Sequence, residues 1–440
     1  MRRLQVDSVE PFPLPGNELH GFQLEVPKPG EEWNSQTLHF DGWALGKEQP
    51  VVAVEVLQDG RSISRIPVRK PRTDVGEQFP DVENAGSSGF AGALGALRLR
   101  RRFELLLRGE LENGVTMPLA IVSGTREPVQ LPPVDGPRPL IVTTLGRTGS
   151  TWCVWMLQSH PEIVAHSPFE NDARVGTYWM SVLQTLSDPA SYLRQVFPGD
   201  AIDKDWWIGR ESDIPSRLND AALSGWLSDA RVYEMALSCR DRIEALYEYI
   251  ADQQGKQASF FVEKYLPHQV PADLLRELYP GAAEVVLVRD LRDVYCSILA
   301  FNRKRGYAAF GREEADSDDD YIDTVRRSGE LLHAHMTEEG REAHLLRYED
   351  LIREPVPTLE PLLEFIGLDP TGAEAMVERA SVSTGGMDHH MTAQSASASI
   401  GRWAKDLEPE LAERCDAVLS PIVADFGYET GEGESTAASA

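Results

Sequence analysis

The sequence predicts an α/β domain, in which helices flank a parallel sheet, preceded by a small antiparallel β-sandwich domain. Three observations predict this arrangement. From residue 139 onward, short apolar runs alternate with helical segments, as in parallel strands joined by helices. Between residues 24 and 125, short strand-like runs follow one another with turn signals between them. A Pro-rich stretch, 126–138, separates the two patterns and predicts a linker.

Composition limits the class of protein. The chain has 440 residues, enough for two domains, and its 42% of hydrophobic residues indicates a globular protein with a substantial core. A formal net charge of −27 argues against a nucleic-acid partner. The cysteines show no metal or CxxC spacing, which favours free thiols in a reducing compartment and no metal site. We expect a cytoplasmic protein, because the N-terminus lacks a secretory signal and no apolar run approaches the ~20 residues of a transmembrane segment.

The N-terminal part divides into an arm and a module. Residues 1–23 are Pro-rich and are expected to form an irregular arm. In the module, 24–125, Asp59-Gly60 predicts a hairpin turn. The runs that predict strands there are 38–44, 51–57, 102–108 and 116–122. The phrases GWAL, VEVLQDGRSI and SSGF resemble Ig-like β-sandwich modules attached to bacterial glycosyltransferases.

The second domain is expected to cover residues 139–430. Residues 178–257 are expected to be mostly helical, and residues 431–440 have the composition of a disordered tail. Apolar runs predict strands at 140–144, 260–262, 284–288 and 344–348, with helices between them.

The first of these strands leads into an anion site. The stretch 139–159 reads PLIVTTLGRTGSTWCVWMLQS, a strand, a Gly-rich turn and a helix. Two glycines, Gly146 and Gly149, allow a tight turn, and Ser150 and Thr151 supply hydroxyls at the helix start. Unpaired N–H groups and the helix dipole favour a phosphate at such a point. Arg147 adds a positive charge, and no acid lies between residues 136 and 161.

A P-loop nucleotide kinase or nucleoside triphosphatase is the first alternative. That motif requires GxxxxGK[ST], whereas this turn has fewer residues between its glycines and no Lys before the hydroxyls. The shorter cradle suits one 5′-phosphate better than a triphosphate.

Five segments in order resemble the sulfotransferases that use 3′-phosphoadenosine 5′-phosphosulfate, over about residues 138–429. LGRTGSTW resembles their 5′-phosphosulfate loop, in which cytosolic members carry Lys and protein-tyrosine members carry Arg at the position of Arg147. VVLVRDLRDVYCS resembles their 3′-phosphate segment. RYEDL and SIGRWAKDL resemble their adenine-contacting and cofactor-closing segments, and EKYLP contains their Lys near the transferred sulfuryl group. The resemblance implies a P-loop-like parallel sheet, the sulfotransferase fold, and a sulfotransferase that requires no metal.

The resemblance also implies roles for single residues. Arg289 and Ser297 would bind the 3′-phosphate, Trp152 would pack on the adenine, Tyr348 would contact it, and Lys264 would lie near the sulfuryl group. Further cofactor-binding positions are Gly146, Arg147, Thr148, Gly149, Ser150, Thr151, Ser399, Gly401, Arg402 and Trp403. The family usually carries basic residues just before the closing segment, where this chain has Ser395, Ser397 and Ser399.

Transfer to a hydroxyl requires a general base. Glu170, in HPEIVAHSPFEND, is the first candidate, because related glycan and tyrosine sulfotransferases place a catalytic Glu there. His166 and His268 are alternatives. Arg147 and Lys264 would stabilise charge on the leaving oxygen. The expected acceptor is a hydroxyl on a glycan or a glycosylated metabolite, and a glycan-binding protein that has lost catalysis is the non-enzyme alternative.

Overall fold

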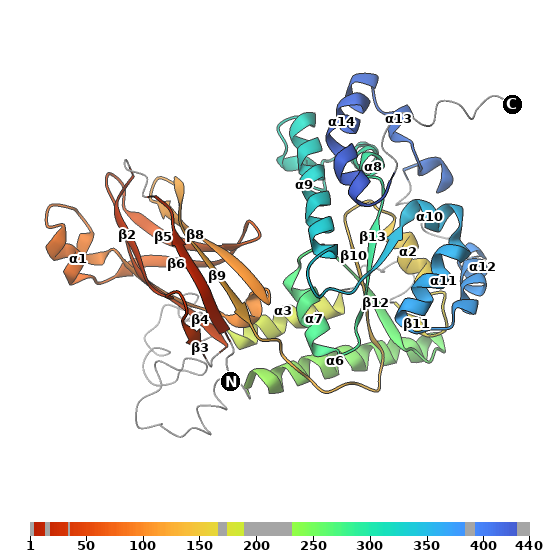
Figure 1. Ribbon diagram of the computed structural model, residues 1–440, viewed down its shortest axis with the longest axis horizontal. Helices are drawn as coiled ribbons and strands as arrows, with labels where there is room; N and C mark the ends of the chain where they lie inside the picture. The colour runs from red at the N-terminus through yellow and green to blue at the C-terminus, as the bar shows by residue number, and fades with distance from the viewer. Residues whose placement is uncertain are drawn as a thin grey trace. The chain divides into compact units, whose positions relative to one another are not determined.

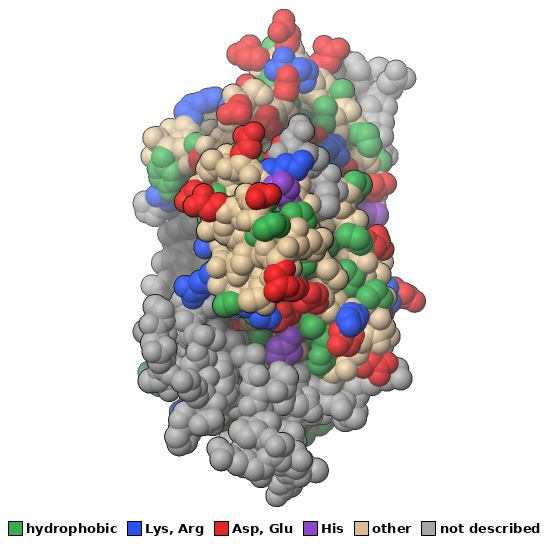
Figure 2. Space-filling model, turned by 90° about the vertical axis from the view of Figure 1, so that its left-hand side faces the viewer, with side chains coloured by type: hydrophobic (Ala, Val, Ile, Leu, Met, Phe, Trp, Pro, Cys, Tyr) green, Lys and Arg blue, Asp and Glu red, His purple; other side chains and the backbone are tan. Residues whose placement is uncertain are grey.

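The computed structural model describes residues 4–13, 18–33, 36–165, 174–188, 231–382 and 392–428 (Figure 1). The chain forms two compact units, the first from residues 1–131 and 178–241, the second from residues 132–177 and 242–440. No helix among the described residues is long and apolar enough to cross a membrane. On the face shown in Figure 2, acidic side chains are spread over the surface, in keeping with the net charge of −27.

The first unit contains a nine-stranded sheet with antiparallel pairing, in the order β2-β4-β7-β6-β5-β8-β9-β1-β3. Its strands are β1 (Leu4–Pro11), β2 (Leu19–Val26), β3 (Glu32–Trp33), β4 (Thr37–Gly46), β5 (Val51–Gln58), β6 (Arg61–Lys70), β7 (Gly89–Gly95), β8 (Arg102–Leu111) and β9 (Thr116–Arg126). A short helix, α1 (Thr73–Gln78), follows β6.

The β6 strand turns this sheet into a two-layered structure. It pairs with β5 in one half and with β7 in the other, and the two halves share a single core. Phe40 and Phe90 enter that core from one half, and Val54 and Leu105 enter it from the other. The expected antiparallel β-sandwich is therefore present. Asp59 and Gly60 both have a positive φ, 51° and 74°, as the predicted hairpin requires.

The predicted irregular arm over residues 1–23 is wrong for two segments, which form β1 and the start of β2. Leu4 and Val6 alternate with polar residues, and both are buried in the core while β1 pairs with β9. The prolines of this region lie at or beyond the end of β1, where a missing N–H costs the sheet little. The prolines therefore end this strand and do not prevent it.

The second unit is built on a five-stranded parallel sheet in the order β11-β12-β10-β13-β14 (Figure 1). Its strands are β10 (Arg138–Thr144), β11 (Ile163–Val164), β12 (Phe260–Tyr265), β13 (Ala283–Val288) and β14 (His344–Arg347). The helices along this part of the chain are α2 (Ser150–Leu157), α3 (Val175–Ser187), α6 (Arg231–Gln254), α7 (Val270–Leu278), α8 (Leu291–Arg305), α9 (Asp318–Met336), α10 (Tyr348–Arg353), α11 (Pro355–Ile366), α12 (Ala373–Val382), α13 (Trp403–Asp406) and α14 (Pro409–Asp425).

Both faces of the parallel sheet are buried, which explains its near-continuous apolar strands. On one face Leu140 and Val142 pack with α2, α11 and α12. On the other, Val286 and Val288 pack with α8, α9 and α14. Each fully buried aliphatic side chain of this kind contributes about 1.5–3 kcal/mol.

The order of the strands places a binding crevice at one point. The chain leaves β10 toward β11 and β12 on one side and later crosses to β13 on the other, so the order reverses next to β10. Open α/β sheets bind ligands at such a switch point, outside the carboxyl ends of the strands. The Gly-rich turn that follows β10 lies there.

Candidate active site

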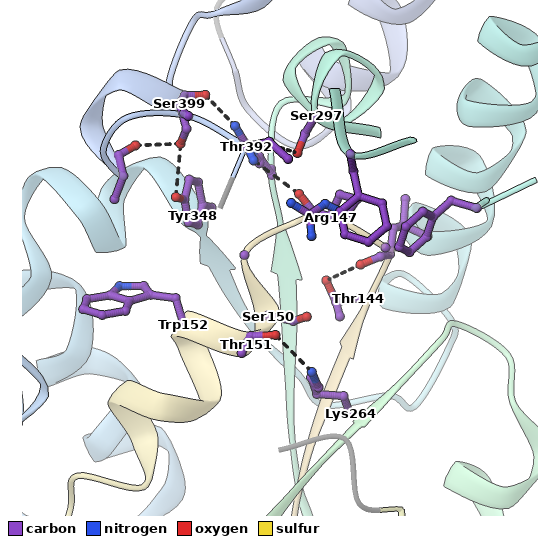
Figure 3. Close-up of a pocket in the computed structure, with 18 of the residues that line it drawn as sticks. Thr144, Arg147, Ser150, Thr151, Trp152, Lys264, Ser297, Tyr348, Thr392 and Ser399 are labelled. Atoms are coloured by element: carbon purple, nitrogen blue, oxygen red, sulfur yellow. Dashed lines mark hydrogen bonds between the residues drawn. The ribbon is translucent and has the colours of Figure 1, made fainter. Parts of the chain in front are cut away.

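A cavity of about 750 Å³ opens at the carboxyl ends of β10, β12 and β13 (Figure 3). Its described lining residues come from the turn after β10, the start of α2, the end of β12, α8, the start of α10 and a segment before α13. They are Thr144, Leu145, Gly146, Arg147, Gly149, Ser150, Thr151, Trp152, Arg174, Lys264, Tyr265, Leu266, Arg289, Ser297, Phe301, Phe310, Tyr348, Thr392, Ala393, Gln394, Ser395, Ala396 and Ser399.

The turn between β10 and α2 depends on two glycines. A Cβ on Gly149 would lie 2.3 Å from a ring carbon of Tyr348, and Gly149 has a φ of +87° that strains any other residue. A Cβ on Gly146 would lie 2.5 Å from the ring of Phe310. Arg147 itself has a φ of 67°. The backbone can therefore approach the cavity closely, and Gly149 caps α2, whose first N–H groups point toward its N-terminus.

Thr148 differs from its neighbours in the turn. Its side chain is buried and is absent from the cavity lining, and its hydroxyl lies 2.5 Å from Thr144 Oγ1. It also donates to the carbonyl of Leu145 at 3.0 Å. The Thr148 hydroxyl therefore holds the turn against β10, and a contribution of Thr148 to cofactor binding would come from its backbone.

Two cations lie at the turn: Arg147 is part of it, and Lys264 approaches it from β12. The Arg147 guanidinium carbon lies 4.6 Å from the ring centre of Phe301. Burial, together with the nearby charges of Arg289 and Arg402, lowers the pKa of Arg147 to about 10, so the side chain stays charged at neutral pH. Lys264 Nζ lies 3.4 Å from Thr151 Oγ1 (Figure 3). Because side chains alternate along β12, Lys264 and Glu263 point to opposite faces of the strand.

Arg289 connects three segments around the cavity. It donates to the carbonyl of Arg147 at 3.3 Å and to the carbonyl of Ser399, and its guanidinium carbon lies 4.8 Å from the ring centre of Tyr348. Its Nε is buried without a hydrogen-bond partner among the described residues. A buried donor without a partner is costly, which suits a ligand acceptor at this point.

The predicted partners of Arg289 lie around it. Ser297 Oγ is 3.2 Å from Thr392 Oγ1, and Tyr348 Oη is 3.1 Å from Ser399 Oγ (Figure 3). Trp152 lines the cavity from α2, and its Nε1 is buried with no hydrogen-bond partner in the described part of the chain. Segments far apart in the sequence thus meet at one edge of the sheet.

Gly401, Arg402 and Trp403 do not line the cavity. Gly401 N and Trp403 N donate to the Asp293 carboxylate at 2.7 and 3.0 Å, and Arg402 donates to Thr392 Oγ1 at 3.0 Å. These three residues support the segment 392–399, which does line the cavity.

Sequence reasoning missed Asp293 and Thr392. Burial raises the pKa of the Asp293 carboxyl, an effect that the charge of Arg289 and two backbone N–H donors oppose. The position of Asp293 in the first turn of α8 can be predicted from the sequence. The sequence does not show that its carboxylate accepts hydrogen bonds from the backbone of Gly401 and Trp403. Thr392 has no such signal at all.

Of the three candidate general bases, the structure describes only one. Glu170 and His166 lie outside the described residues. His268 does not line the cavity, since its ring centre is 5.0 Å from that of His335 and its backbone N–H donates to His335 Nδ1 at 3.1 Å.

His268 also belongs to a group of three potential metal ligands, none of which lines the cavity. His268, His335 and Glu338 have ligand atoms within 4.8 Å of one another. His335 Nδ1 accepts the His268 N–H, and His335 Nε2 lies 2.7 Å from Glu284 Oε1. Both ring nitrogens of His335 are therefore engaged within the protein, which leaves that ring no donor atom for an ion.

Comparisons with known proteins identify the family of this chain. Residues 139–372 match the family model described as "Sulfotransferase family". Solved structures similar to this chain include a sulfotransferase from Alicyclobacillus acidocaldarius (16% identity, 67% of this chain and 95% of that chain, TM-score 0.35). Others are a sulfotransferase domain from the curacin biosynthetic pathway (17%, 66% and 98%, TM-score 0.35) and a mouse sulfotransferase complexed with PAP (10%, 65% and 85%, TM-score 0.32). No curated protein matches. Because the family model covers more than half of the sequence, the chain belongs to the sulfotransferase family.

Proposed function

We propose that this protein transfers the sulfuryl group of 3′-phosphoadenosine 5′-phosphosulfate to an acceptor hydroxyl, with glycans and glycosylated metabolites as the first acceptors to test. One observation carries the proposal. The described lining residues include no acid, and three of their cations, Arg147, Lys264 and Arg289, lie in the segments expected to bind the donor, in a chain with a net charge of −27. A donor with two separated anionic groups needs such a concentration of positive charge.

The residues present fit this donor. Arg289 and Ser297 would hold the 3′-phosphate, where the buried Nε of Arg289 offers a donor. Trp152 and Tyr348 would hold the adenine from two sides of the cavity. The backbone of residues 146–151 would hold the 5′-phosphosulfate at the start of α2. Arg402 supports this arrangement through its hydrogen bond to Thr392.

The chemistry follows from where these groups lie. The bound donor supplies an activated sulfuryl group. Arg147 and Lys264 stabilise the negative charge that forms on the bridging oxygen as its bond to sulfur breaks. The acceptor oxygen forms the new bond to sulfur, and its proton passes to a general base, for which we propose Glu170. The products are a sulfate ester and adenosine 3′,5′-bisphosphate, and no step requires a metal.

Nucleotide binding tests the donor. Adenosine 3′,5′-bisphosphate without magnesium should raise the melting temperature, because binding to the folded state alone adds stability. Stabilisation only by ATP with magnesium would instead support the alternative, a kinase or triphosphatase. Binding of the bisphosphate without turnover of any acceptor would favour the inactive glycan-binding protein.

A substitution tests the base. Glu170→Gln should bind adenosine 3′,5′-bisphosphate with unchanged affinity and lose about 10²–10⁴-fold in kcat, the range of general-base catalysis. His166→Gln serves as the control at the competing position. Full activity of Glu170→Gln contradicts the assignment, and loss of activity in His166→Gln alone transfers it to His166.

We propose that residues 139–430 carry this activity and that the linker 126–138 joins them to the β-sandwich, which begins with β1 and not at residue 24. We also propose a reducing, cytoplasmic location, which the four free and buried cysteines support.

A further inference from the structure

One cation of the cavity belongs to none of the proposed donor-binding segments. Arg174 lines the cavity and is exposed, and it directly precedes α3. Burial raises the pKa of the Tyr265 hydroxyl well above its usual value, and the charge of Arg174 opposes that rise. Tyr265, the neighbour of Lys264 on β12, lines the same cavity as Arg174, and its hydroxyl lies 2.9 Å from where a Cβ on Gly176 would be. In Figure 3, Lys264 and the pair Tyr348 and Ser399 lie on opposite sides of the turn.

A buried carboxylate fixes the backbone next to Arg174. Glu263 is fully buried, and its Oε1 accepts hydrogen bonds from the Gly176 N–H at 2.7 Å and from Tyr247 Oη at 2.5 Å. Its Oε2 accepts from Tyr265 Oη at 2.8 Å. Burial raises the pKa of Glu263, while the hydrogen bonds from Gly176, Tyr247 and Tyr265 oppose that rise. The N-terminus of α3 also favours the charged form.

The contact around Gly176 is tight. A Cβ at this position would lie 2.9 Å from Tyr265 Oη and 3.0 Å from Glu263 Oε2. The start of α3 is thus held against β12, two residues from Arg174. The backbone two residues from Arg174 is therefore fixed by this packed contact and by the hydrogen bond to Glu263.

The way in which the cations of the cavity are shared between the anionic groups of the donor indicates which ligand group Arg174 can bind. In the proposed function, Arg289 serves the 3′-phosphate, while Arg147 and Lys264 serve the 5′-phosphosulfate. Arg174 serves neither group. It lies two residues before Gly176, whose N–H donates to Glu263, so its backbone starts on the β12 side of the cavity, where an acceptor would approach Lys264 and the sulfuryl group. A guanidinium binds one carboxylate through two parallel hydrogen bonds and matches its single charge.

We propose that Arg174 selects acceptors that carry a carboxylate, such as uronic-acid-containing glycans, and that Glu263 is a positioning residue that holds Arg174 at the acceptor side. The proposal rests on the proposed function, since it takes the donor to occupy the other three cations. It deepens that function by naming the acceptor class.

Calorimetry with paired probes tests the specificity of Arg174. The protein is saturated with adenosine 3′,5′-bisphosphate and titrated with methyl glucuronoside and methyl glucoside, and separately with 4-hydroxyphenylacetate and its amide. The acid of at least one pair should bind about tenfold more tightly than its neutral partner, as a charged hydrogen-bonded contact provides. In Arg174→Gln this preference should disappear while the affinity for the bisphosphate stays unchanged. Arg303→Gln, an exposed site on α8, removes an equal charge and should keep the preference.

The positioning role of Glu263 has its own readout. Glu263→Gln replaces one acceptor oxygen by a donor and should reduce the preference for the acid without changing bisphosphate affinity. Tyr247→Phe keeps the carboxylate and removes one donor, so it tests the same contact if Glu263→Gln does not fold. Equal effects on acid and neutral probes would show a merely structural role and overturn the positioning assignment.

The results of these titrations distinguish a failure of the acceptor proposal from a failure of the proposed sulfotransferase function. If the bisphosphate binds but the acid has no advantage in either pair, or if Arg174→Gln keeps that advantage, the acceptor proposal is wrong and the donor assignment stands. If the bisphosphate itself does not bind, the proposed function fails, and the acceptor proposal fails with it.

Discussion

Arg289 at the end of β13 donates a hydrogen bond to the backbone carbonyl of Arg147, 3.3 Å away in the turn after β10. The two residues are far apart in the sequence. Arg289 belongs to the proposed 3′-phosphate site and Arg147 to the proposed 5′-phosphosulfate site. Arg289 also reaches the carbonyl of Ser399. A single side chain therefore sets the separation between the two sites and their distance from the closing segment.

Arg289→Ala should weaken the binding of adenosine 3′,5′-bisphosphate by about 100-fold. The substitution removes a charge-assisted hydrogen bond to the ligand, worth about 1.5–3 kcal/mol, and releases both carbonyls. Calorimetry without magnesium measures the loss. Arg289→Lys keeps the charge but not the planar fork and should recover only part of the affinity. Unchanged affinity in Arg289→Ala means that the 3′-phosphate is bound elsewhere.

Gly149→Ala should lose both stability and nucleotide affinity. The φ of +87° costs an L-residue about 1–2 kcal/mol, and the new Cβ would lie 2.3 Å from the Tyr348 ring. Gly306→Ala is a matched control in the same unit, because Gly306 has a φ of +77° and nothing within 4 Å of the added Cβ. The control should lower only the melting temperature. Equal bisphosphate affinity in the two variants is incompatible with a close approach of Gly149 to Tyr348.

Asp293→Ala should reduce nucleotide affinity although Asp293 does not line the cavity. Its carboxylate accepts hydrogen bonds from the backbone N–H groups of Gly401 and Trp403, which anchor the segment that carries Ser399. We expect a loss of about tenfold, the equivalent of one such contact. Asp406→Ala, which removes the partner of Arg402 instead, tests whether loosening this segment elsewhere has the same effect. Full affinity in Asp293→Ala would show that the anchor is unnecessary.

The sequence predicts the parts of this fold that depend on local pattern. The apolar strand at 140–144, the Gly-rich turn and the helix after it appear where the apolar run and the glycines predict them. The β1 strand was missed because the prolines at its end weighed more than the alternation of Leu4 and Val6. That strand is stabilised by pairing with β9, a contact that no local pattern reveals.

The candidate site also has a part that the sequence predicts and a part that depends on tertiary contacts. The roles of Arg289, Ser297 and Tyr348 are predicted from the resemblance to sulfotransferases, and the sheet topology brings the three residues to one cavity. Thr148 and residues 401–403 are predicted to bind the cofactor, and in the structure the Thr148 hydroxyl, the Gly401 N–H and the Arg402 guanidinium have hydrogen-bond partners within the protein. Which face of a turn a hydroxyl takes depends on neighbours such as Thr144 that only the folded chain supplies.

Acid should destabilise the protein through Glu284. This buried carboxylate on β13 contacts His335 Nε2 at 2.7 Å, Arg341 at 3.0 Å and Arg276. Burial opposes ionisation, but the hydrogen bond from His335 and the charges of Arg276 and Arg341 lower the pKa of Glu284 from 4.5 to about 2. Because the folded-state pKa is depressed, the stabilisation is present above pH 4.5 and is lost as the pH falls toward 2.

Glu284→Gln tests this cluster directly. At pH 7 it should lower the free energy of unfolding by about 3–5 kcal/mol, since it leaves buried cations without their partner. Denaturant unfolding between pH 7 and pH 2.5 should show a flatter acid limb in Glu284→Gln than in the wild type. Glu378→Gln, at an exposed position on α12, is the control and should follow the wild type at every pH. If Glu284→Gln keeps the wild-type slope below pH 4.5, the acid sensitivity arises from other carboxylates, and the Glu284 cluster does not hold α9 to the sheet through its charge.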